Sequence, residues 1–257
     1  EAGLTISRVN EADGVLHAVT IMRDISQIKA VEAEQARFIA VAAHDLRNPV
    51  ASLNTSLYML ERDPNNPKRV QRLKEITADM EQLIEDLLTI SDVNEGKSFQ
   101  MRDMVLQELL EDVVDVQRDN AQESKQITIS TDFALDPMRV YADPTQLKRV
   151  MRNLISNSIN YTQEGGQINV CLYAEDFANR QIEDVTKTSP QFAGQMAIIT
   201  VQDNGNGIKP EDLGKIFLPM YRGDRNTKGT GLGLSISQGI VRKHGGEIRV
   251  ESVFGEG

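Results

Sequence analysis

A row of apolar residues, spaced alternately by four and three, constrains this chain more than any other feature. It comprises Leu46, Val50, Leu53, Leu57 and Leu60. This near-heptad spacing places all five side chains along one face of an α-helix. The stretch must therefore fold as a helix that buries this face against a partner.

His44 lies on the opposite face of the same expected helix. A helix turns by roughly 100° per residue, so His44 is rotated by about 160° from Leu46. Asp45 is the next residue, and Asn48 follows one turn later on nearly the same face as the histidine. The pattern predicts an exposed imidazole with a carboxylate and a carboxamide beside it. The spacing alone also fits a surface histidine without any role.

A second helical pattern follows a turn at 63–67 that contains two prolines. Helix-forming residues dominate both 25–62 and 68–94, and apolar residues repeat every three or four positions. One helical pair has too little core to stand alone, whereas two pairs form a four-helix bundle. We therefore expect an antiparallel helical hairpin that forms a homodimer. Pro49 predicts a kink near 44–48.

Residues 1–25 alternate as two short strands around a turn at Asn10, Asp13 and Gly14. Two strands cannot bury a core by themselves, so we expect them to be the edge of a larger domain. The exit at 24–26, Asp-Ile-Ser, resembles the last strand and exit of a PAS sensor domain. The chain begins with Glu, and we expect it to be a fragment of a longer protein.

Composition narrows the possible ligands. The chain has 257 residues, enough for two domains, and a net charge of −10. This charge argues against nucleic-acid binding through a general basic surface, but it permits a local cationic pocket for a nucleotide. No apolar run approaches the roughly 20 residues of a membrane helix, so any membrane contact would come from parts of the protein outside this sequence. A single Cys171 forms no internal disulfide, and no zinc-ligand cluster exists.

From residue 100 onwards, helical and strand patterns alternate, which indicates an α+β or α/β sandwich. Asp143 and Pro144 are a typical helix start, with the acid as N-cap and the proline in the first turn. Val116 is expected on the buried side of the first helix, and 175–195 form a polar loop. We expect helices at 106–122, 143–160 and 231–244, and strands at 126–130, 138–141, 167–173, 196–202 and 247–253.

Three motifs in this second half carry polar or glycine residues in unusual arrangements. Asn153 and Asn157 lie on one helix face, and carboxamide oxygens suit magnesium. Asp203 follows a strand and can accept a hydrogen bond from an exocyclic amine. Gly205 and Gly207 come next and let backbone approach a ligand closely. Taken singly, the asparagines also fit bonding to nearby backbone, and the glycines fit a tight turn.

The third motif precedes the last expected helix. Its glycines leave amides free at a helix N-terminus, where the helix dipole favours phosphate. Its spacing matches neither the dinucleotide pattern nor a P-loop, and a glycine loop alone is weak support for a ligand site. The motif consists of Lys228, Gly229, Thr230, Gly231, Leu232 and Gly233.

In this order and spacing the motifs resemble those of one family. Residues 153–157 resemble the N box, 203–208 the G1 box and 229–233 the G2 box of the Bergerat-fold (GHKL) ATPases. Residues 216–222 resemble the F box of sensor histidine kinases, and the run His-Asp-Leu-Arg-Asn-Pro at 44–49 resembles their H box. The chain is thus similar to a two-component sensor histidine kinase from about residue 25 to its end.

The resemblance implies three parts: a PAS remnant at 1–25, a signalling helix with the dimerisation and phosphotransfer hairpin at 26–96, and a catalytic ATP-binding domain at 100–257. It implies that His44 accepts phosphate from ATP and passes it to an aspartate of a response regulator receiver domain. Asp45 would orient the imidazole and take its proton. The position of Asn48 suggests a water-orienting role in a phosphatase activity. The fragment would act in the cytoplasm.

The resemblance also implies a nucleotide site. Asp203 would read the adenine amino group, Asn157 would coordinate Mg²⁺ with Asn153 in support, and the third motif would hold the phosphates below a lid at 209–228. The remaining ligand-binding positions are Asn160, Tyr161, Gly205, Gly207, Ile208, Lys228, Thr230 and Leu232. The family commonly has Lys where this chain has Asn160, and Arg149, Arg152 or Lys228 are the candidates to replace that phosphate contact.

Two other functions fit parts of the pattern. One is a chaperone-type or topoisomerase-type ATPase that forms no phosphohistidine. The other is a nucleotide-binding scaffold or a member with phosphatase activity only.

Overall fold

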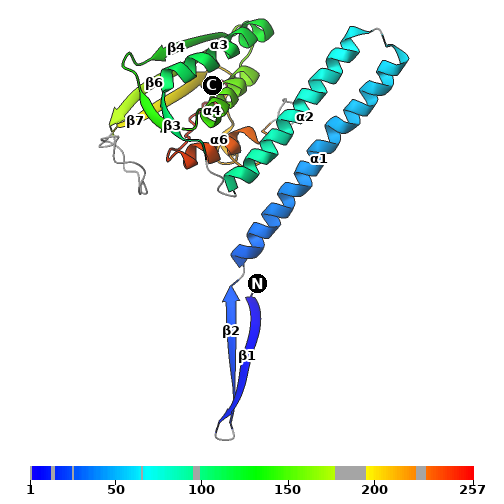
Figure 1. Ribbon diagram of the computed structural model, residues 1–257, viewed down its shortest axis with the longest axis vertical. Helices are drawn as coiled ribbons and strands as arrows, with labels where there is room; N and C mark the ends of the chain where they lie inside the picture. Colours follow the sequence, from blue (N-terminus) through cyan, green and yellow to red (C-terminus); the bar gives the residue numbers. More distant parts are fainter. Residues whose placement is uncertain are drawn as a thin grey trace. The chain divides into compact units, whose positions relative to one another are not determined.

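The computed structural model divides into two compact units, Glu1–Met80 and Glu81–Gly257. It describes residues 2–12, 15–24, 26–64, 66–94, 99–176, 195–223 and 230–257. Figure 1 shows the elements in chain order. The boundary between the units falls inside one helix, whose last residues cluster with the second unit.

The first unit starts with two antiparallel strands, β1 (Ala2–Ala12) and β2 (Val15–Asp24). Their register runs from Ala2 opposite Asp24 to Ala12 opposite Val15, with an irregularity between Ile6 and Arg8. The two predicted strands are confirmed and are longer than expected. The prediction that Asn10 belongs to the turn is wrong, because Asn10 pairs with His17 inside the ladder. Asp13 and Gly14 lie outside the described residues.

The predicted helical hairpin is confirmed. Helix α1 (Ser26–Arg62) continues through Pro49, and α2 (Pro67–Asn94) follows after a short turn. Asn66 starts α2, because its side-chain oxygen accepts from the Lys68 amide at 3.1 Å. Arg69 then donates to the carbonyl of Met59, which ties the two helices together next to the turn. The kink near Pro49 stays a prediction.

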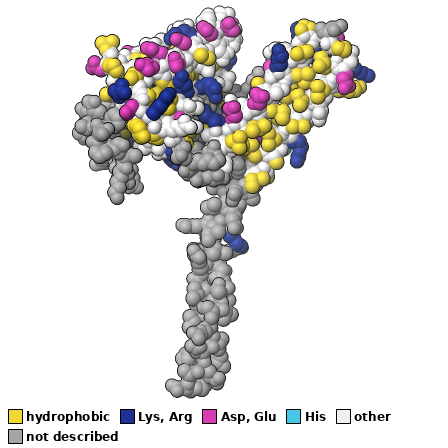
Figure 2. All heavy atoms as spheres, in the orientation of Figure 1, with side chains coloured by type: hydrophobic (Ala, Val, Ile, Leu, Met, Phe, Trp, Pro, Cys, Tyr) yellow, Lys and Arg dark blue, Asp and Glu magenta, His cyan; other side chains and the backbone are white. Residues whose placement is uncertain are grey.

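The apolar face of the hairpin is only partly covered. In this unit Ala42 and Ile76 are buried, but Val50 and Leu57 of the predicted row remain 42% and 44% exposed. Figure 2 shows hydrophobic side chains gathered along the hairpin. Exposed apolar surface in such a row marks an interaction face.

The second unit contains two small sheets. Strands β4 (Thr128–Phe133), β6 (Gln167–Asp176) and β7 (Gln195–Asp203) form one sheet in the order β4-β6-β7. β4 runs parallel to β6, and β7 runs antiparallel to it. Strands β3 (Arg102–Val105) and β5 (Arg139–Ala142) form a separate antiparallel pair.

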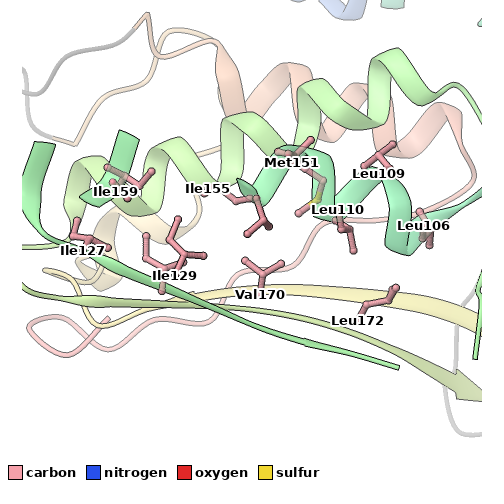
Figure 3. Packing of buried hydrophobic residues seen from close by; sticks show 14 residues of the cluster. Leu106, Leu109, Leu110, Ile127, Ile129, Met151, Ile155, Ile159, Val170 and Leu172 are labelled. Carbon is pink, nitrogen blue, oxygen red and sulfur yellow. The ribbon is translucent and has the colours of Figure 1, made fainter. Parts of the chain in front are cut away.

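Helices cover one face of the three-stranded sheet. They are α3 (Leu106–Lys125) and α4 (Pro144–Tyr161), with α6 (Gly233–Lys243) packed on α4. Buried aliphatic side chains from α3 and α4 meet those of the sheet, as Figure 3 shows. The predicted sandwich is confirmed, and its core positions the one helix that carries the asparagine pair. The core includes Leu106, Leu109, Leu110, Ile127, Ile129, Met151, Ile155, Ile159, Val170 and Leu172.

Two predictions differ from the structure in this unit, and two short elements were not predicted. Val116 is 70% exposed, because only one stripe of α3 faces the core. Residues 247–253 form no strand; Val253 donates to Gly257, and Ser252 accepts from Ile208, so this backbone turns locally. The short elements β3 and α5 (Pro210–Leu213) were not predicted. Most of the expected loop at 175–195 lies outside the described residues, and its two ends extend β6 and β7.

Asp143 holds the start of α4, as predicted. Its Oδ1 accepts from the amides of Thr145 at 2.9 Å and Gln146 at 3.1 Å, and its Oδ2 accepts from the Gln100 amide at 2.8 Å. The Asp143 amide donates to Nε2 of His244 at 3.0 Å. One buried residue therefore joins α4 to the preceding segment and to the end of α6.

We predict that Asp143→Ala destabilises the second unit by about 2 kcal/mol, because three amides lose their acceptor. Denaturant unfolding followed by circular dichroism measures the change. Asp115→Ala is the matched control, since Asp115 is 71% exposed and pairs with Arg118 on the same helix; its effect should stay below about 0.5 kcal/mol. Equal losses in the two variants would contradict the capping role.

Candidate functional site

The imidazole of His44 lies where the sequence predicted it. Its side chain is 67% exposed, and Nδ1 lies 3.2 Å from Oδ1 of Asp45. Nδ2 of Asn48 lies 3.4 Å from the same ring nitrogen. A carboxylate beside Nδ1 favours the tautomer that carries its proton there, which leaves the lone pair on Nε2. The arrangement can therefore present a nucleophilic nitrogen to solvent.

The first and third motifs are in direct contact. Gly233 begins α6, and a Cβ added to it would lie 2.1 Å from Oδ1 of Asn153. The Asn153 amide donates to Oγ of Ser237, one turn further along α6, at 2.9 Å. A side chain at position 233 would therefore displace the carboxamide from this position.

Gly231 is held just as closely by the segment that resembles the F box. It has φ +70°, and a Cβ there would lie 2.9 Å from backbone atoms of Met220 and Tyr221. The Met220 amide donates to the Gly231 carbonyl at 2.9 Å. Only glycine combines this positive φ with such a close approach. Leu232, the next residue, is fully buried and anchors the turn.

The second motif packs against the end of α4. A Cβ on Gly205 would lie 2.6 Å from the carbonyl oxygen of Tyr161, and the Asn206 amide donates to that oxygen at 3.2 Å. Asp203 closes its own turn, since Oδ1 accepts from the Gly205 amide at 3.0 Å. Gly207 has φ +61° and lies against the backbone of 253–254. The amide of Ile208 is bound by Ser252.

Helix α4 is therefore the common support of all three motifs. Asn153 contacts the third motif, and Tyr161, eight residues later, contacts the second. At 1.5 Å per residue these points are about 12 Å apart. That span suits a ligand with an anionic part near one loop and a polar ring near the other.

Asn157 lies between these two contacts on α4. Within the described ranges, no group of three or more His, Cys, Asp or Glu side chains could hold a metal ion. A single carboxamide oxygen, however, suits Mg²⁺, which keeps several waters and takes further oxygens from phosphates. The half-exposed side chain of Asn157, on the helix that meets Gly233, fits such an ion.

The remaining expected positions stay predictions. Lys228 and Gly229 lie outside the described residues. Asn160 is exposed, and its carbonyl accepts from Nζ of Lys125 at 2.8 Å, so the backbone at this position is engaged. Arg149 forms an ion pair with Asp86 of α2 at 2.7 Å and is committed to that partner, while Arg152 is exposed.

Sequence reasoning missed two residues outside the motifs whose side chains hold other site residues in place by hydrogen bonds. Ser237 orients Asn153, and Asp212 accepts from the hydroxyl of Tyr221 at 2.5 Å. This hydrogen bond raises the pKa of Tyr221, with further contributions from burial and from the charges of Asp212 and Glu211. Ser237 lies one turn after Gly233 on α6, and that spacing could have identified it.

Comparisons with known proteins find two family matches in the chain. Residues 142–257 match the family "Histidine kinase-, DNA gyrase B-, and HSP90-like ATPase", and residues 34–96 match the "His Kinase A (phospho-acceptor) domain". The sensor histidine kinase RppB of Synechocystis is 35% identical over 234 residues, which is 87% of this chain and 47% of RppB. The chain belongs to the sensor histidine kinases.

Other relatives of this histidine kinase chain include the sensor protein KinB of Pseudomonas aeruginosa, 28% identical over 93% of the chain and 38% of KinB. The chain spans about half or less of the length of RppB and KinB. The histidine kinase ThkA, solved in complex with the response regulator TrrA, has a TM-score of 0.57 at 22% identity and covers 97% of this chain and 71% of ThkA. ShkA, solved with AMPPNP, has a TM-score of 0.58 at 19% identity, over 86% of this chain and 43% of ShkA. These two likenesses show the fold.

We predict that Gly233→Ala weakens ATP binding by the histidine kinase chain at least tenfold, because the new methyl group forces Asn153 away from α6. Gly214→Ala is the matched control, since a Cβ at Gly214 meets nothing within 4 Å. Calorimetric titration with an ATP analogue measures both variants. Unchanged affinity in Gly233→Ala would show that the contact with Asn153 has no part in binding.

We predict that Tyr221 titrates above the ordinary tyrosine range. A raised pKa in the folded state means that its contribution to stability is full below pH 10 and is lost as the pH rises through the folded value. Asp212→Asn should lower the Tyr221 pKa by removing the carboxylate that opposes ionisation. Ultraviolet titration measures the Tyr221 pKa, and the Tyr221→Phe variant identifies its signal. An unchanged titration curve in Asp212→Asn would mean that other groups raise the pKa.

Proposed function

We propose that the chain autophosphorylates on His44 with ATP and passes the phosphoryl group to an aspartate on a response regulator. The observation that carries the proposal is the exposed His44 with a carboxylate on Nδ1, on the same chain as an ATPase-family unit whose three motifs converge on α4. A nucleotide-binding site and a nucleophile that accepts the phosphoryl group are the two parts that phosphoryl transfer requires.

The transfer follows from the tautomer of His44. The Nε2 lone pair forms a bond to the γ-phosphorus, the bond from that phosphorus to the bridging oxygen breaks, and ADP leaves. Asp45 holds the Nδ1 proton and stabilises the positive ring that forms, and it can take that proton afterwards. The phosphoryl group then moves from nitrogen to a carboxylate oxygen of the regulator, which restores the free imidazole.

Other residues of the chain would bind the nucleotide. The second carboxylate oxygen of Asp203, Oδ2, would accept from the adenine amine, since Oδ1 is used by its own turn. The amides of Gly231 and Gly233 would face the phosphates at the start of α6, whereas the Leu232 amide donates to the hydroxyl of Thr230. Asn157 would hold Mg²⁺ with Asn153 in support, and this ion would neutralise charge on the phosphates.

We further propose that the chain works as a homodimer. Exposed apolar residues run along the hairpin, among them Val50 and Leu57 of the predicted row on α1 and Val70 on α2. Pairing two hairpins would cover this row in a four-helix bundle. None of the helices in the described part of the chain is long and apolar enough to cross a membrane. The chain would act in the cytoplasm, where ATP is available, and 1–25 would be the end of a PAS domain that transmits a signal to α1.

The deciding experiment incubates the chain with ATP labelled in its γ-phosphate. We expect an acid-labile, base-stable label on the wild type and none on His44→Gln. Asp203→Asn should lose the label through lost nucleotide binding, whereas His44→Gln should bind ATP normally. Hydrolysis of ATP without any label on the protein would favour the chaperone-type ATPase, and binding without label or hydrolysis would favour a scaffold or a phosphatase-only member.

We predict that Asn48→Ala lowers the rate of regulator dephosphorylation at least tenfold and leaves autophosphorylation within about threefold of the wild type. The reason is that the carboxamide lies beside the imidazole and can orient a water, while Asp45 alone sets the tautomer. Separate assays with phosphorylated regulator and with labelled ATP distinguish the two rates. A parallel fall in both rates would show that Asn48 also acts in the phosphorylation of His44.

A further inference from the structure

Asp86 of α2 carries a buried carboxylate that the reaction described above does not use. It is 6% exposed and belongs to the second compact unit. A charge at this depth requires partners. Its Oδ1 accepts from Arg149 of α4 at 2.7 Å and from Gln82 at 2.9 Å, and Arg149 also donates to Thr89. The three α2 residues share one helix face.

The second oxygen of Asp86 reaches the phosphate-binding turn. Oδ2 accepts from the hydroxyl of Thr230 at 3.0 Å, and Thr230 lies between the glycines of the third motif. The same hydroxyl accepts from the Leu232 amide at 3.2 Å. Its only proton is therefore given to Asp86. A phosphate could bind this hydroxyl only after Asp86 releases it.

We propose that the carboxylate of Asp86 competes with the phosphates of ATP for the Thr230 hydroxyl and thereby weakens nucleotide binding. This inference rests on the proposed function and adds its regulation. Asp86 is a positioning residue, because it acts on the nucleotide through Thr230. Arg149 balances the charge of Asp86 and so limits its repulsion of an incoming triphosphate.

The continuity of α2 makes the contact adjustable. α2 is one helix from Pro67 to Asn94, so a rotation or shift of its first part carries Asp86 with it. Withdrawal of the carboxylate would free Thr230, whereas its return would engage the hydroxyl again. By linkage, nucleotide binding would in turn favour the arrangement of α2 in which Asp86 is withdrawn.

The two partners of the ion pair give opposite predictions. Asp86→Asn removes the competing charge and leaves Arg149 near the turn, so affinity for magnesium and AMPPNP should rise about fivefold to tenfold. Arg149→Met leaves the carboxylate unbalanced, so affinity should fall by a similar factor. A merely structural role would weaken binding in both variants. Calorimetric titration of the full chain at fixed salt measures each dissociation constant.

Further variants isolate the contact itself. Asp86→Leu combined with Arg149→Met replaces the buried pair by apolar groups, a change that many proteins tolerate, and should bind more tightly than Arg149→Met alone. In a Thr230→Val background, Asp86→Asn should change affinity less than twofold, since the shared hydroxyl is gone. Asp112→Asn is the charge control, because Asp112 is 66% exposed and pairs with Lys148 on α4.

The outcomes separate this inference from the proposed function. Tighter binding in Asp86→Asn, lost in the Thr230→Val background, supports the competition. Unchanged or weaker binding in Asp86→Asn, or an equal gain in Asp112→Asn, overturns it while the kinase assignment stands. A wild-type chain that binds no nucleotide overturns both.

Discussion

The absence of a side chain at two glycines determines how closely the loops of the second unit approach α4. Gly233 lies against the carboxamide of Asn153, and Gly205 lies against the carbonyl of Tyr161. Each contact fixes one loop on the same helix, so the spacing between the loops is set by α4. Such pre-arrangement places two halves of a ligand without further ordering of the protein.

The core keeps α4 in place for this task. Ile155 and its neighbours are buried between α3 and the sheet, so the opposite face of α4 is presented to the glycine loops. The helix ends are held by charges of suitable sign: Asp143 at the first turn and Lys125 at the last carbonyls. Both arrangements agree with the direction of the helix dipole.

Local signals made much of the fold predictable. The spacing of Leu46, Leu53 and Leu60, and the Asp143–Pro144 pair, specify helices and caps without knowledge of distant parts. The exposure of His44 followed from helical rotation alone. The strand expected at 247–253 failed because a strand needs a pairing partner, and the pattern of one segment does not show which partner it has.

The remaining features of the site depend on contacts between distant residues. Ser237 and Asp212 act through side chains brought close by folding, and neither belongs to a glycine or asparagine motif. Arg149 looked like a phosphate ligand because its charge was visible and its partner was not. Asp86 occupies a buried position of α2 near Leu83, and a charged residue in such a row is the one sign the sequence offered.

Lys125 makes the two ends of α4 respond differently to the loss of one positive charge. Its ammonium group donates to the carbonyls of Ile159, Asn160 and Thr162, at 2.8, 2.8 and 2.9 Å. Acetylation of that amine would remove the charge and leave one N–H for three acceptors. The chain around Tyr161 would then loosen on the side expected to hold adenine. The contact between Gly233 and Asn153 would stay intact, so base recognition and phosphate recognition could be lost separately.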